Sequence, residues 1–287
     1  YRSSLPGSFI KLSNGFTHYE LGGPENGAVV ILINGFSIPL YLWDHTFPAL
    51  VEAGYRVLRF DFYGRGYSDR PDINYGPDLF DRQIVELLQA LKIDSPVNVI
   101  GCSMGGIIST IFCDRHPEKV DKLVLIDPAG MMEELSPLLN AMKVPLLGEI
   151  IIHLWGDRFL LPGMAGDLLH PEVYPEYVSK YAPQMKIKGF KRAILSTLRS
   201  GVLQHQEAVY RRVGKQNKKK LLIWGTEDQT IPLAVSDKVC ALLPGVRFHR
   251  IEEAGHVPHY ELPKIVNPIM INFLGDIPDC VIEKRDY

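Results

Sequence analysis

The feature that most constrains the fold is an alternation of short apolar runs with stretches of helical periodicity. The runs are rich in β-branched residues, and most are bounded by Gly, Asn or Asp. Such runs are typical of buried parallel strands, and the helical stretches between them predict connections that cover both faces of a sheet. The fold class is therefore α/β with a mostly parallel sheet. The predicted strands are 28–33, 56–60, 97–100, 122–126, 221–224 and 246–251, and the predicted helices include 79–91, 104–115 and 233–243.

The alternation stops between residues 131 and 214. This segment contains no strand-like run, is rich in Leu, Met, Tyr and Pro, and has helical periodicity near 174–181 and 190–203. We predict a helical cap inserted into a core formed by residues 1–130 and 215–287. Open α/β sheets bind ligands at the carboxyl ends of their strands, so an insertion at that edge is a candidate lid.

Composition excludes several classes of protein. The chain has 287 residues, of which 46% are hydrophobic, and its 31 basic and 33 acidic residues leave a net charge of -2. This balance gives no sign of a nucleic-acid partner, and the apolar runs are far shorter than the roughly 20 residues of a membrane span. The four cysteines lack C-x-x-C spacing, which predicts reduced thiols and favours a cytoplasmic protein. Oligomeric state is not indicated.

The strongest chemical signal is the G-x-S-x-G motif at residues 101–105, directly after a predicted strand and at the start of a predicted helix. A serine on such a sharp turn projects over the sheet edge, and the flanking glycines leave room for close packing. The alternative is an ordinary strand-to-helix turn with a capping serine. We predict that Ser103 is a nucleophile, and the rest of the chain must supply a base.

A serine hydroxyl needs a base and a carboxylate that orients the base. Asp228 follows the strand 221–224, and His256 follows the strand 246–251, so both are predicted to lie on loops at the carboxyl edge of the sheet. The order Ser103, Asp228, His256 is the one expected for this turn. Asp127, at the end of another strand, is a weaker candidate for the acid, and we expect a packing role for His259.

Taken together, these motifs resemble those of the α/β-hydrolase fold family from about residue 15 to residue 274. The resemblance includes Asn34-Gly35-Phe36 after one strand and the segment 61–69 after the next. It implies that Ser103, Asp228 and His256 act as nucleophile, acid and base, and that the insertion occupies the place of the family's cap. It implies neither a metal nor a cofactor, and the spacing of His, Cys, Asp and Glu in the chain suggests no metal site.

Acyl transfer creates an oxyanion that needs N–H donors. One donor is expected to be the backbone N–H of Met104, directly after the nucleophile. The resemblance places the second at the backbone N–H of Phe36. The sequence departs from the family pattern at Asn34, where histidine is usual, but a backbone donor does not depend on that side chain.

The serine at position 103 and the composition of the insertion limit the classes of substrate that fit the chain. Serine rather than aspartate argues against dehalogenase and epoxide hydrolase chemistry, which forms an alkyl ester on a carboxylate. Five of the seven methionines lie in the insertion with several aromatic residues, and this composition predicts an apolar pocket. Candidate substrate-binding residues are Trp155, Phe159 and Met131.

We therefore predict a carboxylic-ester hydrolase of the esterase or lipase type that acts on a small apolar ester, with short to medium acyl esters or monoacylglycerols as the best-fitting substrates. Three alternatives stay open: a C–C bond hydrolase of ring-opened aromatic products, an aminopeptidase for N-terminal proline, and a ligand receptor on the hydrolase scaffold. The aminopeptidase would need carboxylates in the cap, for which Glu133, Glu134 and Glu207 are weak candidates. A receptor would cleave its ligand once or very slowly, whereas an enzyme would turn over repeatedly.

Overall fold

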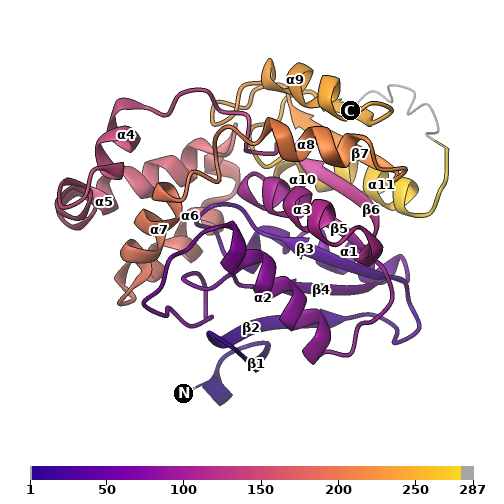
Figure 1. The fold of residues 1–287 in the computed structure, drawn as a ribbon, viewed down its shortest axis with the longest axis horizontal. Helices are drawn as coiled ribbons and strands as arrows, with labels where there is room; N and C mark the ends of the chain where they lie inside the picture. Colours follow the sequence, from indigo (N-terminus) through magenta and orange to yellow (C-terminus); the bar gives the residue numbers. More distant parts are fainter. Residues whose placement is uncertain (1, 279–287) are drawn as a thin grey trace.

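A computed structural model of the chain describes residues 2–278. Within this range, eight strands form one sheet in the order β1-β2-β4-β3-β5-β6-β7-β8 (Figure 1). The first two strands are antiparallel to their neighbours and the remaining pairs are parallel. The predicted α/β class is confirmed. The strands are β1 Ser8–Leu12, β2 Gly15–Gly22, β3 Val29–Ile33, β4 Arg56–Phe60, β5 Val97–Cys102, β6 Val120–Ile126, β7 Lys220–Gly225 and β8 Arg247–Ile251.

The antiparallel hairpin β1–β2 is an element that the sequence analysis did not identify. Leu12 pairs with Gly15, so the loop between the strands consists of Ser13 and Asn14. The strands lie at the edge of the sheet and are only partly buried. They therefore lack the continuous apolar character by which buried parallel strands are recognised.

Helices pack on both faces of the sheet and create two hydrophobic cores. One face carries α2, α3, α8 and α9, and the other carries α1 and α11. Alternate residues of β3 supply the two cores, because Ile31 and Ile33 point to the first and Val30 and Leu32 to the second. The core helices are α1 Phe47–Glu52, α2 Pro77–Ala90, α3 Met104–Arg115, α8 Glu207–Gly214, α9 Val235–Leu242, α10 Pro258–Glu261 and α11 Pro263–Leu274.

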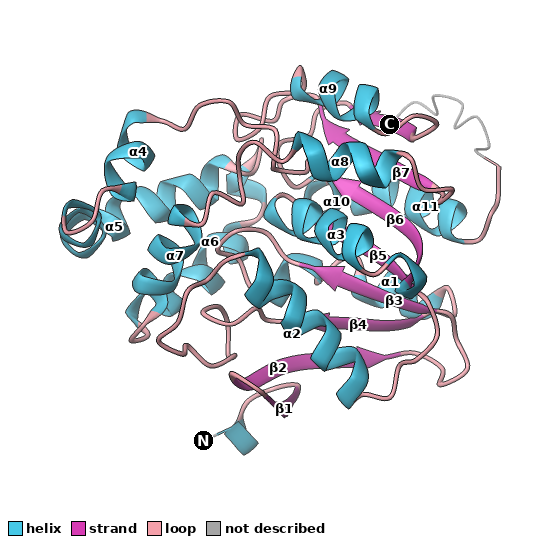
Figure 2. Cartoon of the chain, in the orientation of Figure 1, coloured by secondary structure: helices cyan, strands magenta, loops and turns pink. Residues whose placement is uncertain are grey.

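The insertion between β6 and β7 lies beyond the carboxyl ends of the parallel strands, to which the arrowheads point in Figure 2. It contains α4 Pro137–Lys143, α5 Leu147–Gly166, α6 Pro175–Tyr181 and α7 Phe190–Arg199, which contact one another. The last helix of the segment, α8, instead packs against α3 and α9. We therefore propose that the cap consists of α4–α7 and that α8 belongs structurally to the core, which shortens the predicted 131–214 segment.

Two further sequence expectations concern membranes and thiols. Among residues 2–278, no helix is both long enough and apolar enough to span a bilayer. Cys102, Cys113 and Cys240 are free thiols. Cys280, the fourth cysteine, lies outside the described residues.

Candidate active site

Ser103 sits on a strained turn between β5 and α3. Its φ of 56° and ψ of -122° are unusual for a residue with a side chain. The turn is possible because a Cβ atom on Gly101 would lie 2.2 Å from Ser109 Oγ, and one on Gly105 would lie 2.1 Å from the carbonyl oxygen of Ile33. Only glycine fits at these two positions, and this explains why the G-x-S-x-G motif requires both glycines.

Backbone hydrogen bonds hold this turn in place. The N–H of Ser103 donates to the carbonyl oxygen of Ile126 at the end of β6, at 2.9 Å. The Ser103 carbonyl oxygen accepts from the N–H groups of Gly106 and Ala129, both at 2.9 Å. The strained conformation is thus fixed from two sides, and the side chain faces a cavity that Ser103 lines.

His256 and Asp228 form a buried pair beside the same cavity. His256 Nδ1 lies 2.7 Å from Asp228 Oδ2, and both side chains are at most 3% exposed. Asp228 Oδ1 accepts the N–H groups of Thr230 and Ile231, both at 2.8 Å. Burial alone would lower the pKa of His256, but the attraction and hydrogen bond of Asp228 outweigh it, so the pKa is raised.

The other ring nitrogen of His256 is open. Among the described residues, its Nε2 has no hydrogen-bond partner, so it is not bonded to Ser103 Oγ in this arrangement. Both residues line the cavity, and the hydrogen bond between nucleophile and base is often loose in enzymes without substrate. The structure therefore brings Ser103, Asp228 and His256 to one place, as predicted, although their catalytic roles stay a prediction.

Asp127, the weaker candidate for the acid, lies next to this pair but bonds elsewhere. Its Oδ1 accepts the N–H of Gly225 at 3.0 Å, linking the ends of β6 and β7. Burial and the charge of Asp228 raise its pKa well above the ordinary value. Side-chain atoms of Asp127, Asp228 and His256 lie within 4.8 Å of one another. We interpret this cluster as two coupled carboxyls beside a histidine rather than as a cation site.

The loop after β3 is held by a side chain that the sequence analysis could not place. Asn34 Nδ2 donates to the carbonyl oxygen of Phe60 at 2.7 Å, and its Oδ1 accepts from Trp43 Nε1 at 2.8 Å. Trp43 in turn packs against His259, with ring centroids 4.5 Å apart. Burial lowers the pKa of His259 to about 3, so it is a neutral packing residue, in keeping with the role expected for it.

Arg65 anchors the same loop, a role that was not predicted from the sequence, where only the surrounding segment 61–69 was noted. It is fully buried, and its Nε and Nη2 donate to the carbonyl oxygen of Phe36 at 2.9 and 2.6 Å. Nη2 also donates to Thr197 Oγ1 in the cap, at 2.9 Å. Burial lowers its pKa to about 10, so Arg65 stays charged at neutral pH. Its place after β4, at the same sheet edge as Ser103, was the available signal.

The two expected oxyanion donors have free N–H groups. Among the described residues, neither Phe36 nor Met104 donates its backbone N–H to an acceptor. Met104 is the first residue of α3, where an N–H has no partner within the helix. A Cβ on Gly35, next to Phe36, would lie 3.6 Å from Ser103 Cβ, so the loop directly adjoins the serine.

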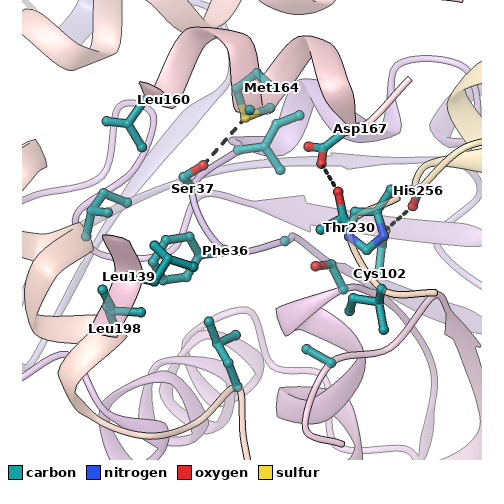
Figure 3. Close-up of a pocket in the computed structure, with 18 of the residues that line it drawn as sticks. Phe36, Ser37, Cys102, Leu139, Leu160, Met164, Asp167, Leu198, Thr230 and His256 are labelled. Carbon is teal, nitrogen blue, oxygen red and sulfur yellow. Dashed lines mark hydrogen bonds between the residues drawn. The ribbon is translucent and has the colours of Figure 1, made fainter. Parts of the chain in front are cut away.

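The cavity that contains Ser103 and His256 lies between core and cap and has a volume of about 280 Å³ (Figure 3). Phe159 lines it, as predicted, but Trp155 and Met131 do not. Trp155 is 46% exposed because its position on α5 turns it away from the cavity, and Met131 is buried beside Met132, which lines the cavity instead. The predicted contact is therefore corrected for these two residues. Other lining residues from the cap are Leu135, Leu139, Met142, Leu160, Met164, Asp167, Tyr177, Ile194 and Leu198.

A buried carboxylate fastens the end of α5 to the loop of His256. Glu261 Oε1 accepts the N–H of Leu169 at 2.6 Å, and its Oε2 accepts the N–H of Gly255 at 2.7 Å. Next to this clamp, the N–H of His256 donates to the carbonyl oxygen of Asp167 at 2.8 Å. Neither Glu261 nor Asp167 was predicted from the sequence. The three glutamates considered for an aminopeptidase do not line the cavity, and Glu133 pairs with Lys238 at the surface.

Comparisons with known proteins agree with this architecture. A family model, the alpha/beta hydrolase family, matches residues 30–269. The AB hydrolase superfamily protein YfhM of Bacillus subtilis is 27% identical over 91% of this chain and 96% of its own length. Monoacylglycerol lipase abhd6-B of Xenopus laevis is 24% identical over 94% of this chain and 82% of its own length.

Solved structures give the same result for the fold. A meta-cleavage product hydrolase from Pseudomonas fluorescens superposes with a TM-score of 0.79 and 24% identity, covering 94% of this chain and 98% of its own. An enol-lactonase from Burkholderia xenovorans has a TM-score of 0.81 and 19% identity, covering 93% and 100%. The family model spans most of the chain. The chain therefore belongs to the alpha/beta hydrolase family.

Proposed function

We propose that the chain is a serine hydrolase that cleaves carboxylic esters of apolar acyl groups through an acyl-enzyme. One observation carries the proposal. His256 has one ring nitrogen fixed by Asp228 and the other open, in the same cavity as Ser103 on its strained turn. This is the arrangement that makes a serine hydroxyl nucleophilic.

The proposed reaction has two halves. Ser103 Oγ attacks the ester carbon while His256 Nε2 accepts its proton, and the N–H groups of Phe36 and Met104 stabilise the oxyanion. His256 then gives this proton to the departing alkoxide, and the acyl group remains on Ser103. Water, deprotonated by His256, attacks the acyl carbon; the bond to Ser103 Oγ then breaks, His256 returns the proton to this oxygen, and the acid is released. Asp228 orients the imidazole and stabilises its charged form throughout.

The cavity walls support an apolar acyl group. Leu139, Met142, Leu160 and Leu198 line the part of the cavity provided by the cap, with Phe159 alongside. Flexible Met and Leu side chains accommodate chains of different length. A cavity of about 280 Å³ favours short to medium acyl chains.

The second candidate is C–C bond hydrolysis, because one relative is called a 2-hydroxy-6-oxononadienedioate/2-hydroxy-6-oxononatrienedioate hydrolase. A dioate carries two carboxylates, which a protein binds with Arg, Lys or backbone N–H groups. Among the described residues that line the cavity there is no Lys or Arg, and one of them is the acidic Asp167. The negative charge of Asp167 repels a carboxylate, so the cavity favours a neutral ester over a dioate. The third reading, a ligand receptor, predicts no repeated turnover.

The test is a p-nitrophenyl ester series of increasing acyl length, combined with labelling by a fluorophosphonate. We expect repeated turnover and labelling in the wild type, and loss of both in Ser103→Ala. Ser179→Ala, which changes an exposed serine of the cap, is the matched control and should behave like the wild type. Full activity of Ser103→Ala would overturn the mechanism, and labelling without turnover would favour the receptor or C–C hydrolysis.

A further inference from the structure

The cavity has two chemically different ends. Leu139, Leu160 and Leu198 lie at one end, whereas Asp167 and Thr230 lie beside His256 at the other (Figure 3). An acyl chain fits the first end. Most of the cavity wall is apolar, so an acyl chain alone does not account for the polar groups beside His256.

Asp167 is placed accurately by contacts with both sides of the site. It follows the last residue of α5, and its carbonyl oxygen accepts the N–H of His256 at 2.8 Å. Its Oδ1 accepts from Thr230 Oγ1 at 3.0 Å, and Thr230 also donates its N–H to Asp228. The Tyr177 hydroxyl lies near enough to this carboxylate to lower its pKa, against the larger effect of burial. The carboxylate is thus held by Thr230 on one side and has Tyr177 as a neighbour in the cavity.

Tyr177, from α6, provides a second polar group at this end. Its side chain is fully buried and lines the cavity, yet its hydroxyl has no hydrogen-bond partner among the described residues. Its ring is fixed by edge contacts with Tyr41 and Tyr260, with centroids 5.9 and 4.8 Å apart. A buried hydroxyl without a partner is costly unless a ligand supplies one.

The direction of the proton transfers decides which half of the ester meets these groups. His256 protonates the departing alkoxide, so the alcohol half must lie against His256 and its neighbours. A carboxylate oxygen can only accept a hydrogen bond, whereas a tyrosine hydroxyl can donate or accept one. A hydroxyl group on the alcohol satisfies both, because it donates to the carboxylate and accepts from the tyrosine.

We propose that Asp167, Tyr177 and Thr230 form a subsite for a free hydroxyl group on the alcohol half of the ester. The inference rests on the proposed function and assigns residues to one part of its substrate range: esters of diols and other polyols, which include the monoacylglycerols. Loss of the hydroxyl leaves the buried Tyr177 hydroxyl and the partly buried Asp167 carboxylate without this partner, which is how polar sites discriminate against analogues that lack one group.

The experiment compares three octanoate esters: the 2-hydroxyethyl and propyl esters, which match in size, and the larger 2-(dimethylamino)ethyl ester. The quantity measured is the ratio of kcat/KM between them at pH 8. This pH lies above the value of about 6 to which burial raises the pKa of Asp167. We expect the wild type to prefer the hydroxyethyl over the propyl ester by about tenfold, the effect of one hydrogen bond to a charged group.

Two nearly isosteric variants test the assignment. Asp167→Asn and Tyr177→Phe should each bring the hydroxyethyl-to-propyl ratio close to one. Asp157→Asn, which changes an exposed aspartate of α5 paired with Lys191, is the matched control and should keep the wild-type ratio. Thermal melting shows whether each variant is folded, and Tyr177→Phe removes only one atom.

The outcomes separate the subsite from the proposed function. Equal rates on hydroxyethyl and propyl esters in the wild type would overturn the subsite, provided that both rates depend on Ser103. An equal loss on both esters in the variants would also overturn it, as would a preference for the dimethylamino ester, which indicates an ammonium site. Hydrolysis that does not depend on Ser103 would instead overturn the proposed function.

Discussion

Residues 2–278 contain two buried histidine–aspartate pairs, and their geometry is nearly the same. His256 Nδ1 lies 2.7 Å from Asp228, and His18 Nδ1 lies 2.7 Å from Asp61, with all four side chains at most 3% exposed. The pairs differ at the second ring nitrogen. His18 Nε2 is bonded to the carbonyl oxygen of Pro6 at 2.8 Å, whereas His256 Nε2 is open beside Ser103. A buried pair is therefore no sign of a catalytic base unless one nitrogen is left for the substrate.

The surroundings of His18 favour its charged form. Both of its ring nitrogens lie against oxygen atoms, Asp61 Oδ2 and the carbonyl oxygen of Pro6, and an imidazolium donates to both. Burial alone would lower the pKa of His18, but Asp61 outweighs it and the pKa is raised. Asp61 also accepts the N–H groups of Leu40 and Tyr67, at 2.8 and 2.9 Å. This second pair has a structural role, because its hydrogen bonds connect β2, η2 (Leu40–Trp43) and the loop after β4.

The largest expected difference between the pairs concerns activity. His256→Gln should lower kcat/KM on a p-nitrophenyl ester by about 10,000-fold, because the serine loses its base. His18→Gln should change it by less than about tenfold, since His18 does not line the cavity. Equal loss of activity in the two variants, with both still folded by circular dichroism, would contradict the different roles assigned to His256 and His18.

The second difference concerns stability. Asp61→Asn removes the counter-charge of the buried His18, and we expect the free energy of unfolding in urea to fall by about 3 kcal/mol. Asp44→Asn is a control, because Asp44 pairs with Arg59 and Lys180 at a partly exposed site, where pairs contribute at most about 1 kcal/mol. Equal stability of the Asp61→Asn variant and the wild type would show that His18 is neutral.

The same contrast shows what the sequence could reveal. Ser103, Asp228 and His256 were found because each lies on the turn or loop that follows a strand, and short-range patterns define strands and turns. His18 and Asp61 are 43 residues apart and Arg65 and Thr197 are 132 apart, so only the tertiary structure brings them together. Glu261 was missed for the same reason, since Leu169, one of its two partners, is 92 residues away. Trp155 was misplaced because composition does not reveal which side of a helix faces the cavity.

The third prediction tests how far the two regions are connected. Arg65 lies in the loop fixed by Asp61 and holds the carbonyl oxygen of Phe36 beside Ser103. Arg65→Met keeps most of the side-chain volume but releases this loop, and we expect kcat to fall about tenfold with little change in KM, because an oxyanion donor acts in the transition state. Arg212→Met, at the surface beside Asp114, should leave both unchanged. A rise in KM alone would indicate a binding role.

The smallest effect is the pH dependence, and it has opposite directions at the two pairs. Activity needs neutral His256, so kcat/KM should rise as the pH increases through the raised pKa of this residue.

The pKa of His18 is also higher in the folded than in the unfolded chain. Its contribution to stability is therefore complete below the unfolded value of about 6.5 and is lost as the pH rises through the folded value. The difference in unfolding free energy between wild type and His18→Gln isolates this contribution from that of His256. It should shrink between pH 6 and pH 9, and a constant difference would show that His18 does not change its proton affinity on folding.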